Sequence, residues 1–300
     1  MKVALIQDSP VLFDLEASLQ KVETLVAEAN EPSVDLVLFP EAYLSAYPRG
    51  LSFGTVVGSR SEFGRDMWLR YWESSLKVPG QAVDRLGEIA KTHDCFLVIG
   101  VIEQGETGTL YCTMLYFDHK GTLLGKHRKL KPTAAERIVW GEGDGTDLHV
   151  YDSPYGKLGG LICWENYMPL ARTWLYQQGV EIYMAPTADQ RDSWQATMQH
   201  IACEGRCYVL GCNQYVTRAD YPNDLPGEDV SQLPEVSSRG GSVIVDPLGQ
   251  VIAGPLWDER GILRAELDLK LVTKGKMDFD PVGHYARNDV FQLLGPEKEL

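Results

Sequence analysis

The sequence of 300 residues lacks long hydrophobic runs and has few basic residues for its size. No apolar stretch approaches the roughly 20 residues of a membrane-spanning helix, and the apolar segment "VALI" near the N-terminus is too short for the core of a signal peptide. Lys and Arg number 28 against 42 Asp and Glu, so the net charge is −14. Because such a surface repels phosphate backbones and anionic lipid head groups, we expect a cytoplasmic protein with no nucleic-acid or membrane partner.

Cysteine is also scarce. In a chain of this length without secretory features, the cysteines are expected to be reduced thiols and not a disulfide framework. Cys203, Cys207 and Cys212 lie near His200, but their C-x3-C-x4-C spacing is not a usual zinc spacing. We therefore predict no metal site and no cofactor. The six cysteines are Cys95, Cys112, Cys163, Cys203, Cys207 and Cys212.

The chain has no Ser/Pro-rich linker and no block of charge that would divide it. A hydrophobic content of 44% is enough for a large core. We expect residues 1–300 to form one domain, with a short C-terminal tail from about residue 286.

Predicted strands and helices alternate along the chain. Apolar runs predict strands, and apolar residues at helical spacing from Leu15 to Val26 predict a helix between the first two of them. The mixture of β-α-β units and hairpins predicts an α/β fold of two packed sheets covered by helices. A segment rich in Asp, Glu, Pro and Ser, residues 218–238, is expected to be a long surface loop. Helices are predicted at 15–29, 81–93, 170–179 and 193–206; strands at 2–7, 34–41, 95–104, 180–186, 241–255 and 261–269; and hairpins at 110–130 and 148–163.

Three reactive side chains each stand just beyond a predicted strand. Glu41 follows the apolar run in "VLFPEAY", Lys129 lies in "GKHRKLKPT", and Cys163 ends the strand in "GLICWEN". A carboxylate, an ammonium and a thiol together supply a base, a cation for developing negative charge and a nucleophile. They are a complete set for attack on the carbon of a carbonyl or a nitrile.

Each of the three also has a purely structural interpretation. Glu41 alone would be a solvated residue at a strand end, and Lys129 would belong to a basic surface patch. An arbitrary cysteine is more often an inert buried thiol, which is our interpretation of Cys95, Cys112 and Cys212. Cys163 differs, because a turn and a helix beginning near Met168 would direct backbone N–H groups toward its sulfur and lower its pKa. Its coincidence with Glu41 and Lys129 favours the catalytic interpretation.

Long phrases of the sequence resemble the nitrilase superfamily, and more narrowly its true nitrilase branch. They include "LFPEAYLSAYPRG", "GKHRKLKPTAAERIVWGEGDGT" and "CWENYMPLARTWLYQQGVEIYMAPTAD". The resemblance implies a four-layer αββα sandwich. It also implies that Cys163 is the nucleophile, Glu41 the general base and Lys129 the cation beside the tetrahedral intermediate. Glu136, in "KPTAAERIVW", corresponds to a second glutamate beside this triad.

Several aromatic residues lie near the triad in the sequence and are candidates for a substrate pocket, although half of them are expected to be core. The resemblance implies that Tyr167 and the loop at residues 186–194 shape specificity. The candidate aromatic residues are Tyr43, Tyr47, Trp140, Trp164 and Tyr167, and the predicted substrate-binding residues are Trp164, Tyr167, Tyr47 and Thr187.

The resemblance implies hydrolysis of a small organic nitrile to a carboxylic acid and ammonia, through a thioimidate and a thioester on Cys163. An amidase or carbamoylase using the same triad is the alternative, and an inactive scaffold with the same fold is a further one. We expect a homodimer built on the helix in residues 169–179, or a higher homo-oligomer.

Overall fold

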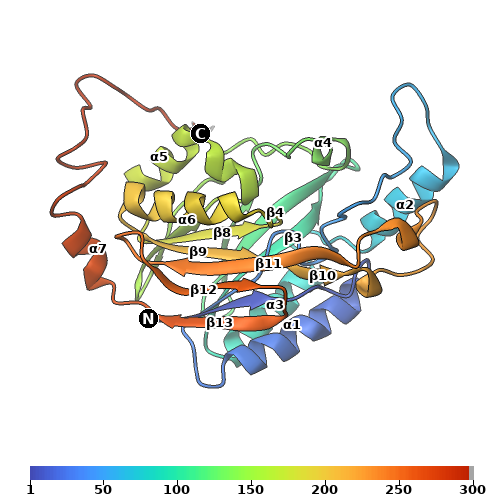
Figure 1. The fold of residues 1–300 in the computed structure, drawn as a ribbon, viewed down its shortest axis with the longest axis horizontal. Coiled ribbons are helices and arrows are strands. Elements are labelled where there is room, and N and C mark those ends of the chain that lie inside the picture. Colours follow the sequence, from blue (N-terminus) through green and yellow to red (C-terminus); the bar gives the residue numbers. More distant parts are fainter. Residues whose placement is uncertain (297–300) are drawn as a thin grey trace.

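A computed structural model describes residues 1–296, and its strands form two sheets (Figure 1). In spatial order the first sheet consists of β13 (Gly261–Glu266), β1 (Lys2–Gln7), β2 (Leu36–Leu38), β3 (Phe96–Gln104), β4 (Leu110–Phe117) and β5 (Leu123–Arg128). The second consists of β10 (Tyr215–Thr217), β11 (Val236–Val245), β9 (Tyr208–Asn213), β8 (Ile182–Thr187), β7 (Gly156–Gly160) and β6 (Tyr151–Ser153), with β12 (Val251–Trp257) paired to β11.

Strand direction is mixed in both sheets. The central strands β1, β2 and β3 run parallel to one another, as do β7, β8 and β9, whereas every other pairing is antiparallel. Parallel neighbours require a crossover, and helices supply it on each sheet. The α-helices are α1 (Leu15–Ala29), α2 (Glu62–Glu73), α3 (Gln81–Thr92), α4 (Glu136–Val139), α5 (Pro169–Gln177), α6 (Asp192–Gly205) and α7 (Lys270–Gly275).

The helices cover the outer faces of the two sheets, which gives four layers (Figure 1). α1 and α3 pack on the first sheet, and α5 and α6 pack on the second. The alternation of side chains along each strand divides the core accordingly: in β1, Val3 and Leu5 face the second sheet, whereas Ala4 and Ile6 face the helices. The expected αββα sandwich is therefore the observed arrangement.

Local chemistry explains why the predicted helix at 15–29 has the observed bounds. The Asp14 carboxylate accepts a hydrogen bond from the Ala17 N–H and so caps the first turn. Leu19, Val22 and Val26 then lie on one face and are buried against the first sheet.

The expected loop at residues 218–238 is only partly correct. Two short 3₁₀ turns interrupt it, at Arg218–Asp220 and Val230–Gln232, and β11 already begins at Val236. Tyr221 and Leu225 are buried, so the segment packs against the interior and is not a free surface loop.

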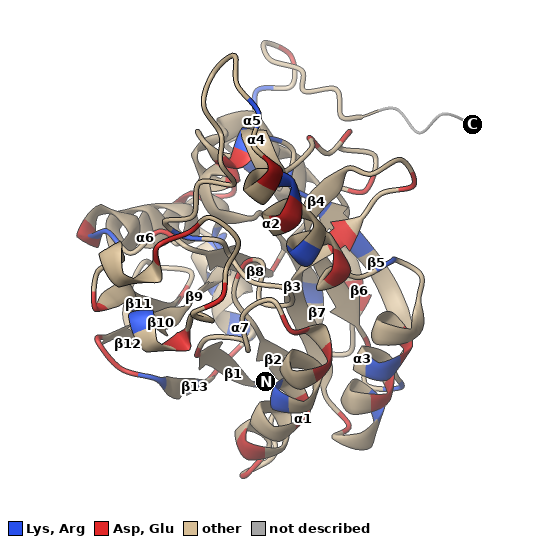
Figure 2. Cartoon of the chain, turned by 90° about the vertical axis from the view of Figure 1, so that its right-hand side faces the viewer, with Lys and Arg blue, Asp and Glu red and all other residues tan. Residues whose placement is uncertain are grey.

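Charged residues are spread over helices and loops, with acidic ones the more frequent (Figure 2). Within residues 1–296, no helix has both the length and the apolar composition that crossing a membrane requires.

Candidate active site

Glu41 lies in a tight turn that follows β2 and packs against the middle of β3. The turn needs the left-handed conformation at Ala42, whose φ is 49°. Its close approach to β3 depends on Gly100, where a Cβ atom would lie 2.3 Å from the Pro40 carbonyl oxygen and 2.8 Å from the Glu41 Cα. The Gln214 amide donates to the Glu41 carbonyl oxygen at 2.5 Å, so the second sheet also fixes the turn.

Lys129 directly follows β5 and is almost completely buried. Its N–H donates to the Cys112 carbonyl oxygen at 2.8 Å, which continues the ladder with β4. Its ammonium donates to Glu41 Oε1 at 2.6 Å and to Glu136 Oε2 at 2.7 Å, and lies 5.5 Å from the centre of the Trp140 ring. The cation therefore holds both carboxylates in place.

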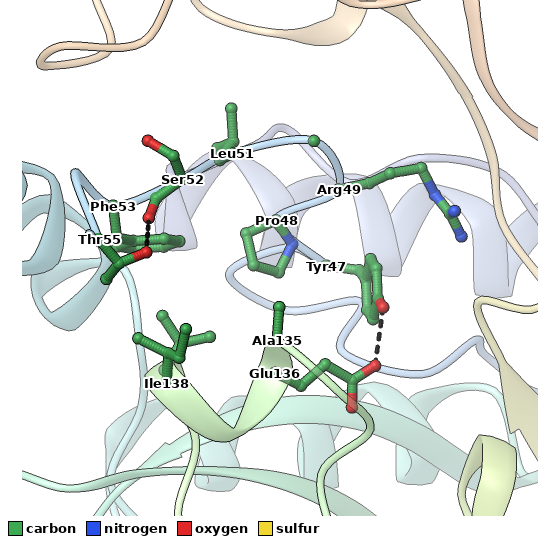
Figure 3. A pocket seen from close by; sticks show the side chains of 12 residues that line it. Tyr47, Pro48, Arg49, Leu51, Ser52, Phe53, Thr55, Ala135, Glu136 and Ile138 are labelled. Atoms are coloured by element: carbon green, nitrogen blue, oxygen red, sulfur yellow. Dashed lines mark hydrogen bonds between the residues drawn. The ribbon is translucent and has the colours of Figure 1, made fainter. Parts of the chain in front are cut away.

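Glu136 stands at the start of α4 and is held from three sides, of which Figure 3 shows the contact with Tyr47. Besides Lys129, the Tyr47 hydroxyl donates to its Oε1 at 2.7 Å and the Thr133 N–H donates to its Oε2 at 2.7 Å. Its side chain is 10% exposed. A surface ion pair with Arg137 is excluded for Glu136, because its charge is directed inward at Lys129.

Cys163 begins a 3₁₀ helix, Cys163–Tyr167, just beyond β7. Its φ of 51° lies in the left-handed region, which costs energy for a residue with a side chain and often marks a functional site. The Thr187 hydroxyl donates to its Sγ at 3.2 Å and itself accepts from the Asp189 N–H at 2.9 Å. The predicted helix start near Met168 is confirmed, since α5 begins at Pro169.

The acids of the site are shifted toward their neutral forms. Burial raises the pKa of Glu41, although the Lys129 ammonium opposes the rise. Burial also raises the pKa of Cys163, and the Glu41 carboxylate adds to that effect, whereas Lys129 and Thr187 oppose it. The expectation of a lowered thiol pKa is therefore wrong for this structure, because the loss of solvation outweighs the nearby N–H groups and cation.

A protonated thiol needs a base in reach, and Glu41 offers a free oxygen. Glu41 Oε2 is buried and has no hydrogen-bond partner within residues 1–296. The Cys163 thiol is close enough to lower the pKa of Glu41 in part. The thiol and the carboxyl group therefore interact across the site.

A buried group that the sequence analysis missed connects the strands carrying Lys129 and Cys163. Glu165 accepts from the Leu130 N–H at 2.6 Å and from the Ile162 N–H at 2.7 Å, which are the neighbours of the two reactive residues. His127 Nε2 lies 3.1 Å from both Glu165 oxygens, and its Nδ1 lies 3.2 Å from Asp147 Oδ1. Burial lowers the pKa of His127, but the two carboxylates outweigh it and raise the pKa to about 10. An imidazolium ion thus holds the Glu165 bridge in place.

A cavity of about 240 Å³ opens at Cys163. Of the predicted substrate-binding residues, Tyr47 and Trp164 line it. Thr187 is buried and contacts the sulfur instead, and Tyr167 lines a different surface hollow beside α5. Tyr43 and Trp140 are core residues. The full lining is Tyr47, Arg49, Thr133, Glu136, Cys163, Trp164, Ala188, Asp189, Gln190 and Arg191, so the loop at residues 186–194 does shape the cavity.

A second cavity of about 310 Å³ adjoins the first and shares Tyr47, Arg49 and Glu136 with it. Figure 3 shows it between the loop that carries Tyr47 to Thr55 and helix α4. The hydrogen bond between Tyr47 and Glu136 stands between these two walls.

Within the described residues, no group of three His, Cys, Asp or Glu side chains is arranged to hold a metal ion.

A comparison with protein families gives a match over most of the chain. The model of the carbon-nitrogen hydrolase family matches residues 2–277. This chain belongs to the carbon-nitrogen hydrolase family. Its solved structural neighbours include a carbon-nitrogen hydrolase from Helicobacter pylori (TM-score 0.74, 19% identity, covering 97% of this chain and 96% of that one). Another is a member of branch 10 of the nitrilase superfamily from Saccharomyces cerevisiae (TM-score 0.72, 24% identity, 95% and 96%).

Curated relatives of this carbon-nitrogen hydrolase are named nitrilases. One from Nicotiana tabacum, a bifunctional nitrilase/nitrile hydratase, is 48% identical over 98% of this chain and 85% of its own length. The aliphatic nitrilase of Sinorhizobium fredii is 47% identical over 99% of this chain and 96% of its own length. Nitrilase 3 of Arabidopsis thaliana is 48% identical over 98% and 86%. The predicted membership of the nitrilase superfamily is confirmed.

Proposed function

We propose that this carbon-nitrogen hydrolase converts an organic nitrile to the carboxylic acid and ammonia, with Cys163 as the nucleophile. The observation that supports this best is that the buried ion pair of Lys129 and Glu41 lies close enough to Cys163 to act on its thiol, while Cys163 itself lines a cavity. Identity of 46–48% to relatives named nitrilases favours nitriles over amides as substrates.

The first step forms a bond between the sulfur of Cys163 and the nitrile carbon. The thiol gives its proton to Glu41 Oε2 as it attacks, and the nitrile nitrogen receives a proton from Glu41, so the product is a thioimidate. A thiol is suited to this attack because sulfur is far more nucleophilic than a neutral hydroxyl. Lys129 and the Trp164 N–H stabilise the charge that develops on nitrogen, a contribution on the order of 3 kcal/mol per donor.

Two water molecules complete the hydrolysis. The first adds to the thioimidate carbon as Glu41 takes its proton, and the tetrahedral adduct then expels ammonia to leave a thioester. The second water adds in the same way, and the adduct releases the carboxylic acid and the Cys163 thiol. Expulsion of sulfur from the first adduct would release an amide instead. Glu41 and Glu136 favour the acid, because their negative charge stabilises a protonated departing nitrogen.

A panel of aliphatic, arylaliphatic and aromatic nitriles with their matching primary amides tests this proposal. We expect one ammonia per nitrile consumed, acid as the main product and slow turnover of the amides. After rapid quenching, mass spectrometry of the intact protein should show a substrate-sized adduct that is absent from Cys163→Ala. Cys95→Ala, which removes another buried thiol, should keep the activity. Fast amide hydrolysis without turnover of any nitrile would establish the amidase alternative.

We also propose that the protein is cytoplasmic and forms a homodimer, or a higher homo-oligomer, through α5. Exposed apolar side chains at the start of this helix support the proposal, because Leu170 is 68% exposed and Met168 is 38% exposed.

A further inference from the structure

Most charged residues that line the Cys163 cavity form an ion pair, but one does not. Arg191 and Asp189 form an ion pair, and Glu136 is paired with Lys129. Arg49 lines the same cavity and has no carboxylate oxygen within 4 Å among the described residues. Of the four charged residues in the lining, it alone has no partner of opposite charge within residues 1–296.

The position of Arg49 leaves most of its donors available. One of its terminal N–H groups donates to the Ala188 carbonyl oxygen, and its guanidinium lies 5.3 Å from the centre of the Tyr47 ring. A guanidinium has five N–H donors in a planar fork that matches a carboxylate. The side chain is partly buried and extends from its loop past Tyr47 (Figure 3). The backbone contact and the ring therefore hold the fork in place without neutralising it.

We propose that the substrate is a small nitrile carrying a carboxylate, and that Arg49 binds this carboxylate. The inference rests on the proposed nitrile hydrolysis and adds the substrate class. The lining agrees with it, since Thr133, Gln190 and the four charged residues offer polar groups beside apolar surface, around a space of only about 240 Å³. That volume fits a short carbon chain between the two polar ends.

A purely electrostatic role for Arg49 is the competing explanation, because the site contains two carboxylates, Glu41 and Glu136, and one ammonium, Lys129. Both carboxylates, however, already share Lys129 at 2.6 and 2.7 Å, whereas Arg49 lies beyond 4 Å from either. The overall charge of −14 would repel an anionic substrate, so a fixed cation at the cavity is the local feature that makes such a substrate bind.

The test compares 3-cyanopropanoate with 3-cyanopropanamide, which have the same shape but differ by one charge. The wild-type protein should hydrolyse the nitrile group of the carboxylate with the higher kcat/KM. Arg49→Gln should raise KM for the carboxylate about 10- to 100-fold, the range expected for charge-assisted hydrogen bonds, and leave the neutral nitrile within about twofold. Turnover of the neutral nitrile also shows that the variant is folded.

Arg137→Gln is the matched control, because it removes the same charge from the exposed surface of α4. It should change KM for the carboxylate by less than about twofold. An equal loss of kcat/KM for both nitriles in Arg49→Gln would overturn the inference and leave nitrile hydrolysis standing. A higher wild-type kcat/KM for the nitrile group of 3-cyanopropanamide than for that of 3-cyanopropanoate would do the same. Hydrolysis of neither nitrile, nor of any nitrile in the wider panel, would overturn both.

Discussion

At the scale of single residues, the site places two buried acids, Glu41 and Cys163, beside the buried ammonium of Lys129. Burial raises the pKa of Glu41 and of Cys163, while the pKa of Lys129 lies well above its usual range because the neighbouring acids outweigh its own burial. The thiol is therefore protonated before the substrate arrives. In the proposed mechanism, its reactivity depends on Glu41 accepting the proton during the attack, and not on a thiolate formed beforehand.

Glu136→Gln tests whether the second glutamate supports catalysis through Lys129. The substitution keeps the shape but removes the charge that faces the ammonium at 2.7 Å. We expect kcat to fall at least 100-fold, because Lys129 and Tyr47 lose the group that orients them. The melting temperature should change by only a few degrees, since Glu41 still pairs with Lys129.

Glu142→Gln is a suitable control, because it removes the same charge from an ion pair with Lys131 in which both side chains are about half exposed. Exposed pairs contribute about 0 to 1 kcal/mol, so its activity and stability should match the wild type. A near wild-type kcat for Glu136→Gln would mean that Glu136 has only a structural role.

The sequence allowed Glu41, Lys129 and Cys163 to be chosen together, because each follows a predicted strand and together they supply a base, a cation and a nucleophile. The strands themselves are not neighbours, since β2 and β5 are separated by β3 and β4, and β7 lies in the second sheet. It did not reveal His127 or Glu165. His127 stands in the basic run "KHRKLK", which is typical of a surface patch, and Glu165 directly follows residues already chosen for another reason. Their contact joins positions 38 residues apart, and periodicity and spacing carry no information on such a pair.

At the scale of elements, the site depends on how closely the turn at Glu41 approaches β3. Gly100→Ala should disturb it, since the new Cβ would meet the backbone of Pro40 and Ala42 at 2.3 and 2.6 Å. Backbone cannot yield as a flexible side chain can, so we expect a loss of stability of about 1 to 3 kcal/mol and a fall in kcat of at least tenfold.

Gly261→Ala provides the comparison within the same sheet. Its Cβ would meet only the end of the Leu256 side chain, at 3.2 Å. Gly100→Ala should therefore unfold at a lower urea concentration and turn over nitrile more slowly than Gly261→Ala. Wild-type turnover in Gly100→Ala would mean that the position of the Glu41 turn does not limit the rate.

The bridge between β5 and the 3₁₀ helix of Cys163 should make stability depend on pH. The pKa of His127 is raised to about 10 from an unfolded value of about 6.5, so its charged form stabilises the fold. That contribution is fully present below about pH 6.5 and is lost as the pH rises through about 10. His127→Gln should reduce the free energy of unfolding by on the order of 3 kcal/mol at pH 6, and the difference from wild type should shrink toward pH 10.

Urea unfolding at pH 6, 8 and 10 measures this difference, and His200→Gln serves as the control. His200 is 65% exposed on α6, and its Nε2 lies 3.7 Å from Glu204 Oε1, which is a long contact. His200→Gln should therefore change the free energy of unfolding only slightly at each pH. A gap between wild type and His127→Gln that stays constant across the range would show that His127 is not charged in the folded protein.

Elements with a long apolar run or a continuous apolar helix face were predicted well, and two elements without either were missed. Helix α1 has the predicted bounds, because a cap and a continuous apolar face agree in the sequence. Helix α2 was not predicted, because it buries only Gly64, Met67 and Tyr71, a narrow face that includes a glycine and gives no long apolar pattern in the sequence. Strand β9 was also missed, because its sequence YVLGCN has only a short apolar run that ends at Gly211.

At the scale of the whole molecule, the two sheets face each other and leave the outer helices as the surfaces available to a second copy. The apolar side chains at the start of α5 are the part of this surface that the proposed dimer would bury, and a two-fold interface would bring the same helix from each copy together. The aromatic pair formed by Trp164 and Tyr167, with ring centres 5.7 Å apart, lies directly before this helix. Contact between copies would therefore rest on the chain segment that also carries Cys163.

Leu170→Glu tests this assembly. Leu170 is 68% exposed on α5, so the substitution leaves the core of each chain intact but places a charge in the proposed apolar interface. We expect light scattering coupled to size exclusion to give at least twice the chain mass of 33.5 kDa for the wild type, and about the chain mass for the variant. Activity should fall together with the dimer fraction, because the 3₁₀ helix of Cys163 loses the support of the partner. Ile252→Glu, at a 41% exposed position on β12, should remain dimeric. A wild-type monomer, or an undisturbed dimer in Leu170→Glu, would exclude α5 as the contact.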